Sequence, residues 1–119
     1  MKSEQPKRSA LSVAIIASLF CVATSGDAYA AGDVKTGREK ALMCQACHGT
    51  DGLSKVPDAP NIAAQIEPYL AAQLKAFKSG ARSNESMSVV AQTLSDKDID
   101  DLAAYFSAIE IKVVKVPGE

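Results

Sequence analysis

Residues 44–48 read CQACH, and this C-x-x-C-H stretch decides how the rest of the chain is interpreted. The spacing is typical of covalent haem attachment. Two thiols one helical turn apart can both reach the vinyl groups of one porphyrin, and the histidine that follows then stands under the iron as its proximal ligand. We therefore expect one haem c, bonded to Cys44 and Cys47, with His48 on the iron.

Other interpretations of these residues fit less well. A structural zinc site needs four ligands, usually Cys and His, and residues 31–119 contain only Cys44, Cys47 and His48. A thioredoxin-like redox pair follows a strand, whereas the residues before the motif, GREKALM, favour a helix. A disulfide between the two thiols is possible in an oxidising compartment, but it gives His48 no role.

The start of the chain, residues 1–30, is predicted to be a cleavable signal peptide. A basic start at residues 2–8 precedes an apolar run at residues 10–23, and the AYA that ends at Ala30 fits the small-x-small cleavage rule. The apolar run is shorter than the about 20 residues that a membrane-spanning helix needs, so an uncleaved anchor is the weaker alternative. Export would leave one domain, residues 31–119, in the periplasm without stable membrane insertion.

That domain has 119 − 30 = 89 residues, and a chain this small is only marginally stable by itself. A buried porphyrin would add apolar mass to its core, which is poor in aromatic side chains. The domain carries 10 Lys and Arg against 12 Asp and Glu, a balance of 10 − 12 = −2. This balance argues against nucleic-acid binding, which needs a basic face.

A first helix is predicted to begin after Asp33, a suitable N-cap, and to run into the haem motif. Its apolar stripe would contain Val34, Ala41 and Leu42. Gly37 lowers helix propensity, so we expect a packing reason, namely a second helix that crosses closely there. A glycine that is merely tolerated is the alternative.

Two further helices are predicted. The first begins near Pro68 and ends at Gly80, with an apolar stripe of Leu70, Leu74 and Phe77. The second spans about residues 96–110, after an N-cap signature at residues 95–98, and has an apolar face. The acidic residues in its first turns are interpreted as a solvated helix start. The tail beyond it is predicted to be extended or frayed.

Residues 49–61 hold two glycines and two prolines and are predicted to form a loop across one edge of the haem. Pro60 follows His48 by 60 − 48 = 12 positions. A main-chain carbonyl near this proline could accept the other ring N–H of His48 and thereby fix the tautomer of the ring. An ordinary turn proline is the alternative, and residue type alone does not decide between them.

A sixth ligand is expected to be a soft donor on a segment that can cross the far face of the ring. Met43 adjoins Cys44 on the proximal side and cannot reach round. Met87 follows a polar loop and precedes an apolar stretch, which suits a ligand strap. We therefore expect His48 and Met87 to ligate the iron. In the alternative, Met87 only packs, and water or a lysine is the sixth ligand.

With these features in place, the chain resembles the small bacterial class I cytochromes c. It is most similar to the group that includes single-domain carriers and two-domain, dihaem relatives. The likeness covers nearly all of residues 32–109. It rests on the haem motif with its preceding helix, on PNIAAQIEPYLAAQLKAFKSGARSN at residues 60–84, on Met87, and on LSDKDIDDLAAYF at residues 94–106.

The resemblance implies an all-α cytochrome c fold whose first and last helices cross beside the haem edge. It also implies thioether bonds at Cys44 and Cys47, axial ligation by His48 and Met87, and support of the histidine by Pro60. The single C-x-x-C-H indicates a monohaem form. One departure is expected at the haem-edge loop, where the family often has Leu-Ala-Gly-Gln and this chain has IAAQ at residues 62–65.

The resulting interpretation is a periplasmic one-electron carrier without catalytic chemistry. Its partners would be redox protein donors and acceptors bound weakly and transiently, and the protein itself would be a monomer or a weak dimer. One alternative is a haem-bearing electron-entry subunit of a larger periplasmic oxidoreductase. Another is a ligand-binding or peroxidatic haem protein, which needs an open sixth position on the iron.

Overall fold

The computed structural model describes residues 31–118, so the predicted signal peptide lies outside the described residues. Within this part the chain forms helices and no strands, and the all-α prediction is confirmed. No helix here is long and apolar enough to cross a bilayer. The elements are α1 (Val34–Lys40), the 3-10 turn η1 (Ala41–Met43), α2 (Gln45–His48), α3 (Glu67–Ser79), α4 (Glu85–Gln92) and α5 (Asp96–Ser107).

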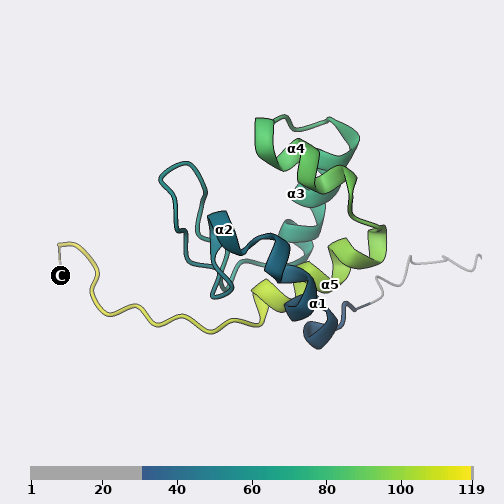
Figure 1. The fold of residues 1–119 in the computed structure, drawn as a ribbon. Coiled ribbons are helices and arrows are strands. Elements are labelled where there is room, and N and C mark those ends of the chain that lie inside the picture. The colour runs from purple at the N-terminus through teal and green to yellow at the C-terminus, as the bar shows by residue number, and fades with distance from the viewer. Residues whose placement is uncertain (1–30, 119) are drawn as a thin grey trace, which may run out of the picture.

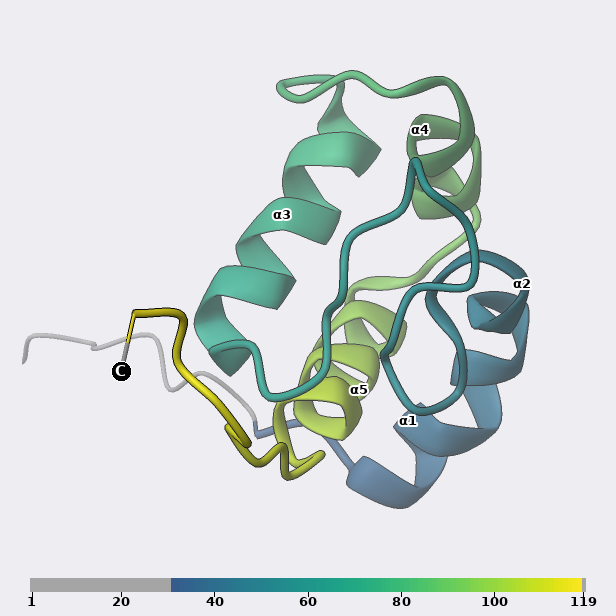
Figure 2. The same ribbon diagram turned by 90° about the vertical axis from the view of Figure 1, so that its left-hand side faces the viewer.

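The helices are arranged in two groups. Figures 1 and 2 show α1, α2 and α5 below α3 and α4, and Figure 2 shows the long loop after α2 between α3 on the left and α2 and α4 on the right. The C-terminal residues 109–118 contain no helix and are mostly exposed, and Figure 1 shows them leading away from the helices. Helix α2, which carries the haem motif, lies below α4 in Figure 2 and next to the long loop.

Helix α1 begins where the sequence predicts, because the Asp33 carboxylate accepts the main-chain N–H of Thr36 at 2.6 Å. The same hydrogen bond lowers the pKa of Asp33. The predicted apolar stripe is wrong, however: Ala41 is buried, whereas Val34 and Leu42 are exposed. The helix tightens into the 3-10 turn η1 at Ala41, and the smaller number of residues per turn changes which side chains face inward.

Gly37 lies where α1 crosses α5. A Cβ atom at this position would stand 2.0 Å from the main-chain oxygen of Asp101 and 2.8 Å from the Cβ atom of Tyr105. The two backbones are therefore too close for any side chain larger than hydrogen. The predicted helix crossing is confirmed, and Gly37 is not merely tolerated in its helix.

The core is built around the inner face of α5. Ser95 and Asp98 form a reciprocal capping box, so the helix begins as predicted. It ends at Ser107, with Ala108 as its C-cap, rather than near residue 110. The predicted apolar face is buried in the core. The buried core cluster is Ala41, Leu70, Ala71, Leu94, Ile99, Leu102, Ala103 and Phe106.

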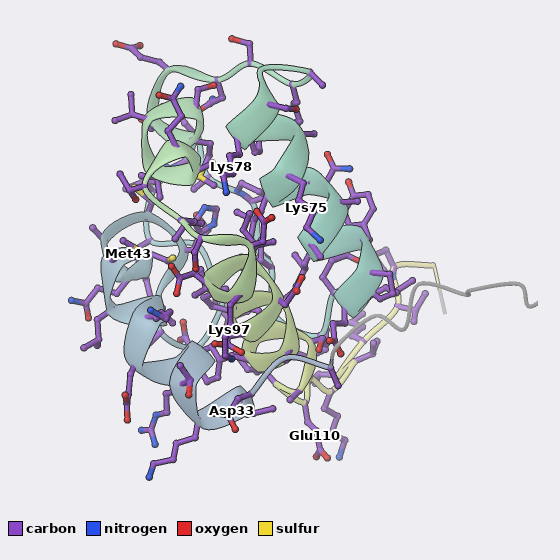
Figure 3. The ribbon with its side chains drawn as sticks, turned by 90° about the vertical axis from the view of Figure 1, so that its right-hand side faces the viewer. Asp33, Met43, Lys75, Lys78, Lys97 and Glu110 are labelled. Atoms are coloured by element: carbon purple, nitrogen blue, oxygen red, sulfur yellow. The ribbon has the colours of Figure 1, made fainter. Side chains whose placement is uncertain are left out.

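The acidic residues of α5 are not simply a solvated helix start, contrary to the prediction. Each has a lysine partner, and two of these lysines come from α3, where Figure 3 shows Lys75 and Lys78 beside α5. Asp101 is fully buried. The hydrophobic pattern missed these contacts because three of the four lysines come from outside α5, and only Lys97 lies on the same helix. The pairs are Lys78–Asp96, Lys40–Asp98, Lys75–Asp100 and Lys97–Asp101.

Helix α3 agrees with its prediction at both ends. Pro68 lies in its first turn, where a missing N–H costs nothing, and Gly80 ends it with a left-handed φ of 80°. Leu70 and Phe77 are buried and Leu74 is half-buried. This helix packs on α5, on the side of the core opposite to α1.

Candidate functional site

The C-x-x-C-H residues form one tight turn. Cys44 stands between η1 and α2, and the main-chain N–H of His48 donates to its carbonyl at 3.0 Å. Both thiols are free. Burial and the neighbouring Cys47 thiol raise the pKa of the Cys44 thiol to about 11, so this group is protonated at neutral pH. The turn thus holds the two thiols three positions apart at one short helix, with Cys44 as its N-cap, and this is the spacing of thioether attachment.

His48 is buried, and its ring is fixed by one hydrogen bond. The Nδ1 atom stands 2.9 Å from the main-chain oxygen of Pro60. A carbonyl oxygen can only accept, so Nδ1 carries the proton and Nε2 keeps its lone pair for a metal. Of the two roles that residue type left open for Pro60, the structure shows the acceptor role.

The loop between α2 and α3, residues 49–66, is held by several main-chain hydrogen bonds. Lys55 N–H donates to the Cys47 carbonyl at 2.8 Å, which closes the loop onto the haem motif. Its other end is closed by the Gly52 carbonyl, which accepts from the main-chain N–H groups of Ile62 at 2.8 Å and Ala63 at 3.1 Å. These contacts bring Pro60 back to His48.

Two side chains that sequence reasoning missed also hold this region. Asn61 Oδ1 accepts the main-chain N–H of Ser54 at 2.7 Å. The Tyr105 hydroxyl donates to the Thr50 carbonyl at 2.6 Å, which ties α5 to the segment directly after His48. An asparagine beside a proline is a general turn signal, but nothing in the sequence pairs a tyrosine with a residue 55 positions away.

Ala64 occupies the position at which the resemblance leads us to expect glycine. Its φ is +56°, in the left-handed region that favours glycine. Its N–H donates to the Phe106 carbonyl at 2.9 Å, which anchors the end of the loop to α5. The alanine therefore adopts the glycine-like conformation, and the backbone carries the strain.

Met87 lies in the first turn of α4, and it is half-buried. The polar residues 81–84 before it form a loop, as the sequence predicts. The helix itself was not predicted: Asn84 caps it by accepting the main-chain N–H groups of Ser86 at 3.0 Å and Met87 at 2.9 Å. Figure 2 shows α4, which holds Met87, above α2, which holds His48, so the two residues lie in different halves of the molecule. Met43, in contrast, is 51% exposed beside the motif.

The donor set fits a haem better than a bare metal ion. Among residues 31–118 no three of His, Cys, Asp and Glu are arranged to hold a metal ion, which argues against the zinc alternative. Two thiols followed directly by an imidazole with a free Nε2 atom are instead the groups that a covalently attached haem c takes from a C-x-x-C-H motif.

The sequence model for cytochrome c matches residues 34–109. The chain belongs to the cytochrome c family. The residues matched run from the first residue of α1 to just beyond the end of α5, so they include the helix crossing and the whole haem motif. The family assignment gives this cytochrome a covalently bound haem c and makes the domain an electron-transfer domain rather than an enzyme.

Individual relatives agree with this assignment. Cytochrome c-554(548) of Halomonas halodenitrificans is 45% identical over 83 residues, which are 67% of this chain and 100% of the relative. The thiosulfate dehydrogenase electron acceptor of Thiomonas intermedia is 38% identical over 112 residues, 92% of this chain and 48% of the relative.

A solved structure confirms the cytochrome c fold. It is the crystal structure of reduced recombinant cytochrome c4 from Pseudomonas stutzeri, which is 40% identical, with a TM-score of 0.63. The match covers 67% of this chain and 47% of the other. The chain also spans about half the length of the curated cytochrome c4 sequences that it matches.

Proposed function

We propose that this cytochrome is a periplasmic one-electron carrier whose haem iron is ligated by His48 and Met87. Cys44 and Cys47 carry the thioether bonds. The observation that supports this proposal most directly is the hydrogen bond from His48 Nδ1 to the Pro60 carbonyl at 2.9 Å, which leaves Nε2 as the ring's only metal-binding atom. When bound, the haem supplies reversible one-electron chemistry at its iron.

The residues around the haem determine its reduction potential. A methionine thioether favours the reduced iron and raises the reduction potential, relative to a second imidazole. The Pro60 carbonyl lowers the reduction potential. It accepts a hydrogen bond from the His48 Nδ1–H, and this bond makes the imidazole a stronger electron donor to the oxidised iron. Burial of His48 excludes water from this side of the site.

Visible and near-infrared spectra of the purified holoprotein test the ligand assignment. We expect a low-spin haem c with the charge-transfer band of a methionine–iron bond in the oxidised form. We also expect that the reduced protein does not bind carbon monoxide rapidly at neutral pH. Rapid binding would indicate an open sixth position and support the ligand-binding or peroxidatic alternative, for which residues 31–119 offer no second histidine.

The compartment and the start of the domain form part of the same proposal. Residues 1–30 are a signal peptide, and the exported domain begins at Ala31. This boundary is supported by the described structure, in which helix α1 and its Asp33 cap follow directly. N-terminal sequencing of the periplasmic haem protein should give Ala31, and a protein that retains residues 1–30 in the membrane fraction would contradict the proposal.

A second candidate function is a dedicated electron-accepting subunit of a larger oxidoreductase. It is favoured by the likeness to the Thiomonas intermedia protein, which is named a thiosulfate dehydrogenase electron acceptor and matches 92% of this chain. Size-exclusion chromatography of native periplasmic extract separates the two functions. A single small haem species supports the free carrier with transient partners, and co-elution with an oxidoreductase supports the subunit.

A further inference from the structure

The Pro60 carbonyl lies in a loop without regular secondary structure. No helix ladder fixes the direction of this oxygen, although the His48 ring depends on it. The direction must therefore come from contacts within the loop. The relevant contacts are those of the next residue, because the Pro60 carbonyl and the Asn61 N–H belong to one planar peptide unit.

Asn61 is the residue that fixes this peptide unit. Its Oδ1 atom accepts the main-chain N–H of Ser54 at 2.7 Å, across the width of the loop. On the other side, Ile62 N–H donates to the Gly52 carbonyl at 2.8 Å. The Asn61 Cα atom is thus held by its own side chain and by the following residue, and a planar peptide unit attached to a fixed Cα atom has little freedom to turn its oxygen away from His48.

We propose that Asn61 is a positioning residue for the haem site. It acts through the Pro60 carbonyl and sets the strength of the hydrogen bond that His48 Nδ1 donates. A weaker bond makes the imidazole a poorer donor, which destabilises the oxidised iron and raises the reduction potential. This inference rests on the proposed ligation by His48.

The same loop offers a matched control. The Ser54 hydroxyl donates to the Val56 carbonyl and accepts from the Val56 N–H, so Ser54→Ala removes side-chain contacts in the loop. It leaves the Ser54 main-chain N–H, which is the group bonded to Asn61. Asn61→Asp is the conservative variant, because it keeps an oxygen at the Oδ1 position, whereas Asn61→Ala removes the acceptor. Should Asn61→Ala yield no holoprotein, Asn61→Ser keeps a polar side chain but is one bond shorter, which withdraws its oxygen from the Ser54 N–H.

The experiment measures solvent exchange of the ring Nδ1–H of the axial histidine by NMR in the holoprotein, together with the reduction potential. In Asn61→Ala we expect exchange to accelerate by a factor of about three to ten, as the loss of one net hydrogen bond implies, and the potential to rise. Asn61→Asp should exchange at the wild-type rate, and Ser54→Ala should change neither quantity.

Each other outcome overturns the inference. Wild-type exchange in Asn61→Ala shows that the Pro60 carbonyl keeps its direction without this side chain. Equal acceleration in Ser54→Ala shows that any loosening of the loop has the same effect. The wild-type spectrum separates these results from a failure of the proposed function. If wild-type holoprotein shows no axial-histidine Nδ1–H resonance, the ligation by His48 is itself wrong.

Discussion

The main-chain N–H of Asp33 donates to the carboxylate of Asp101 at 2.8 Å, so the residue that caps α1 is held by a fully buried side chain of α5. The Lys97 ammonium donates to the same carboxylate at 2.8 Å, and Figure 3 shows Lys97 in the region of Asp33. Hydrogen bonds to a charged, buried group are among the stronger ones in proteins. This contact therefore stabilises the crossing of the first and last helices.

Replacement of Asp101 tests the contribution of this contact. We expect Asp101→Ala to lower the free energy of unfolding by about 2–4 kcal/mol, because it removes the hydrogen bonds from Asp33 and Lys97 and leaves the Asp33 N–H unpaired. Asp101→Asn keeps an acceptor for that N–H and should lose less. Urea unfolding of the holoproteins gives both values, and a loss below about 1 kcal/mol in Asp101→Ala would contradict the role assigned to it.

Acid stability should depend on Asp98. The hydrogen bond from Lys40, together with those of the capping box, lowers the pKa of Asp98 from 3.8 to about 2. The folded state therefore binds this proton less readily than the unfolded state, and its stabilisation is present above about pH 4 and is lost as the pH falls towards 2. In Asp98→Asn we expect a shallower decrease of stability over this range.

The size of that effect is about 1 kcal/mol, because the pair is partly hydrated and is screened by salt. Circular dichroism during acid titration measures it. Glu110→Gln, which changes an exposed acid beyond the end of α5, is the control and should follow the wild-type curve. An Asp98→Asn curve that matches wild type between pH 4 and 2 would show that the shifted group lies elsewhere.

Met87→Ala should remove the proposed sixth ligand. We expect loss of the methionine–iron band, a high-spin or substituted haem, and a lower reduction potential, since no thioether then favours the reduced iron. Met43→Ala is the matched control, because Met43 is exposed beside the motif and its loss should leave the spectrum intact. A near-infrared band that persists in Met87→Ala would remove Met87 from the site.

Gly37→Ala should be strongly destabilising. Its Cβ atom would stand 2.0 Å from the Asp101 main-chain oxygen, so the two helices must separate, at a cost of about 2–3 kcal/mol. Gly80→Ala provides the comparison. Nothing lies within 4 Å of a Cβ atom at Gly80, so only its positive φ is penalised, by about 1–2 kcal/mol. Thermal unfolding that ranks Gly80→Ala as the more harmful change would refute the close crossing.

Ala64→Gly should stabilise the protein slightly. It relieves the left-handed φ of +56°, although glycine also gains entropy in the unfolded state, so the net gain is at most about 1 kcal/mol. The hydrogen bond from residue 64 to the Phe106 carbonyl uses the main chain and is retained. A loss of stability on chemical unfolding would show that the alanine methyl group contributes packing that outweighs the strain.

Local signals in the sequence predicted the parts of the fold that depend on near neighbours. The Asp33 cap, the capping box at Ser95 and the Gly80 stop each need only residues within one turn. Gly37 predicted a close crossing because few other reasons place a glycine inside a helix. These signals were sufficient for an all-α fold.

The remaining features depend on residues that are distant in the sequence. The burial of Asp101 could not be predicted, because its partner Asp33 lies 68 positions away. The Tyr105–Thr50 hydrogen bond could not be predicted either, because these two residues are 55 positions apart. The helix that holds Met87 was missed for a local reason, because Asn84, at the end of the polar loop, was not recognised as a strong N-cap.

The crossing at Gly37 and Asp101 encloses every residue assigned to the haem site, from Cys44 to Met87, within one loop of the chain. Separation of these two helices would therefore open both faces of the site together. Detachment of the sixth ligand and loss of the helical contact should occur as one cooperative event, and the colour of the oxidised protein would then report the docking of its last helix.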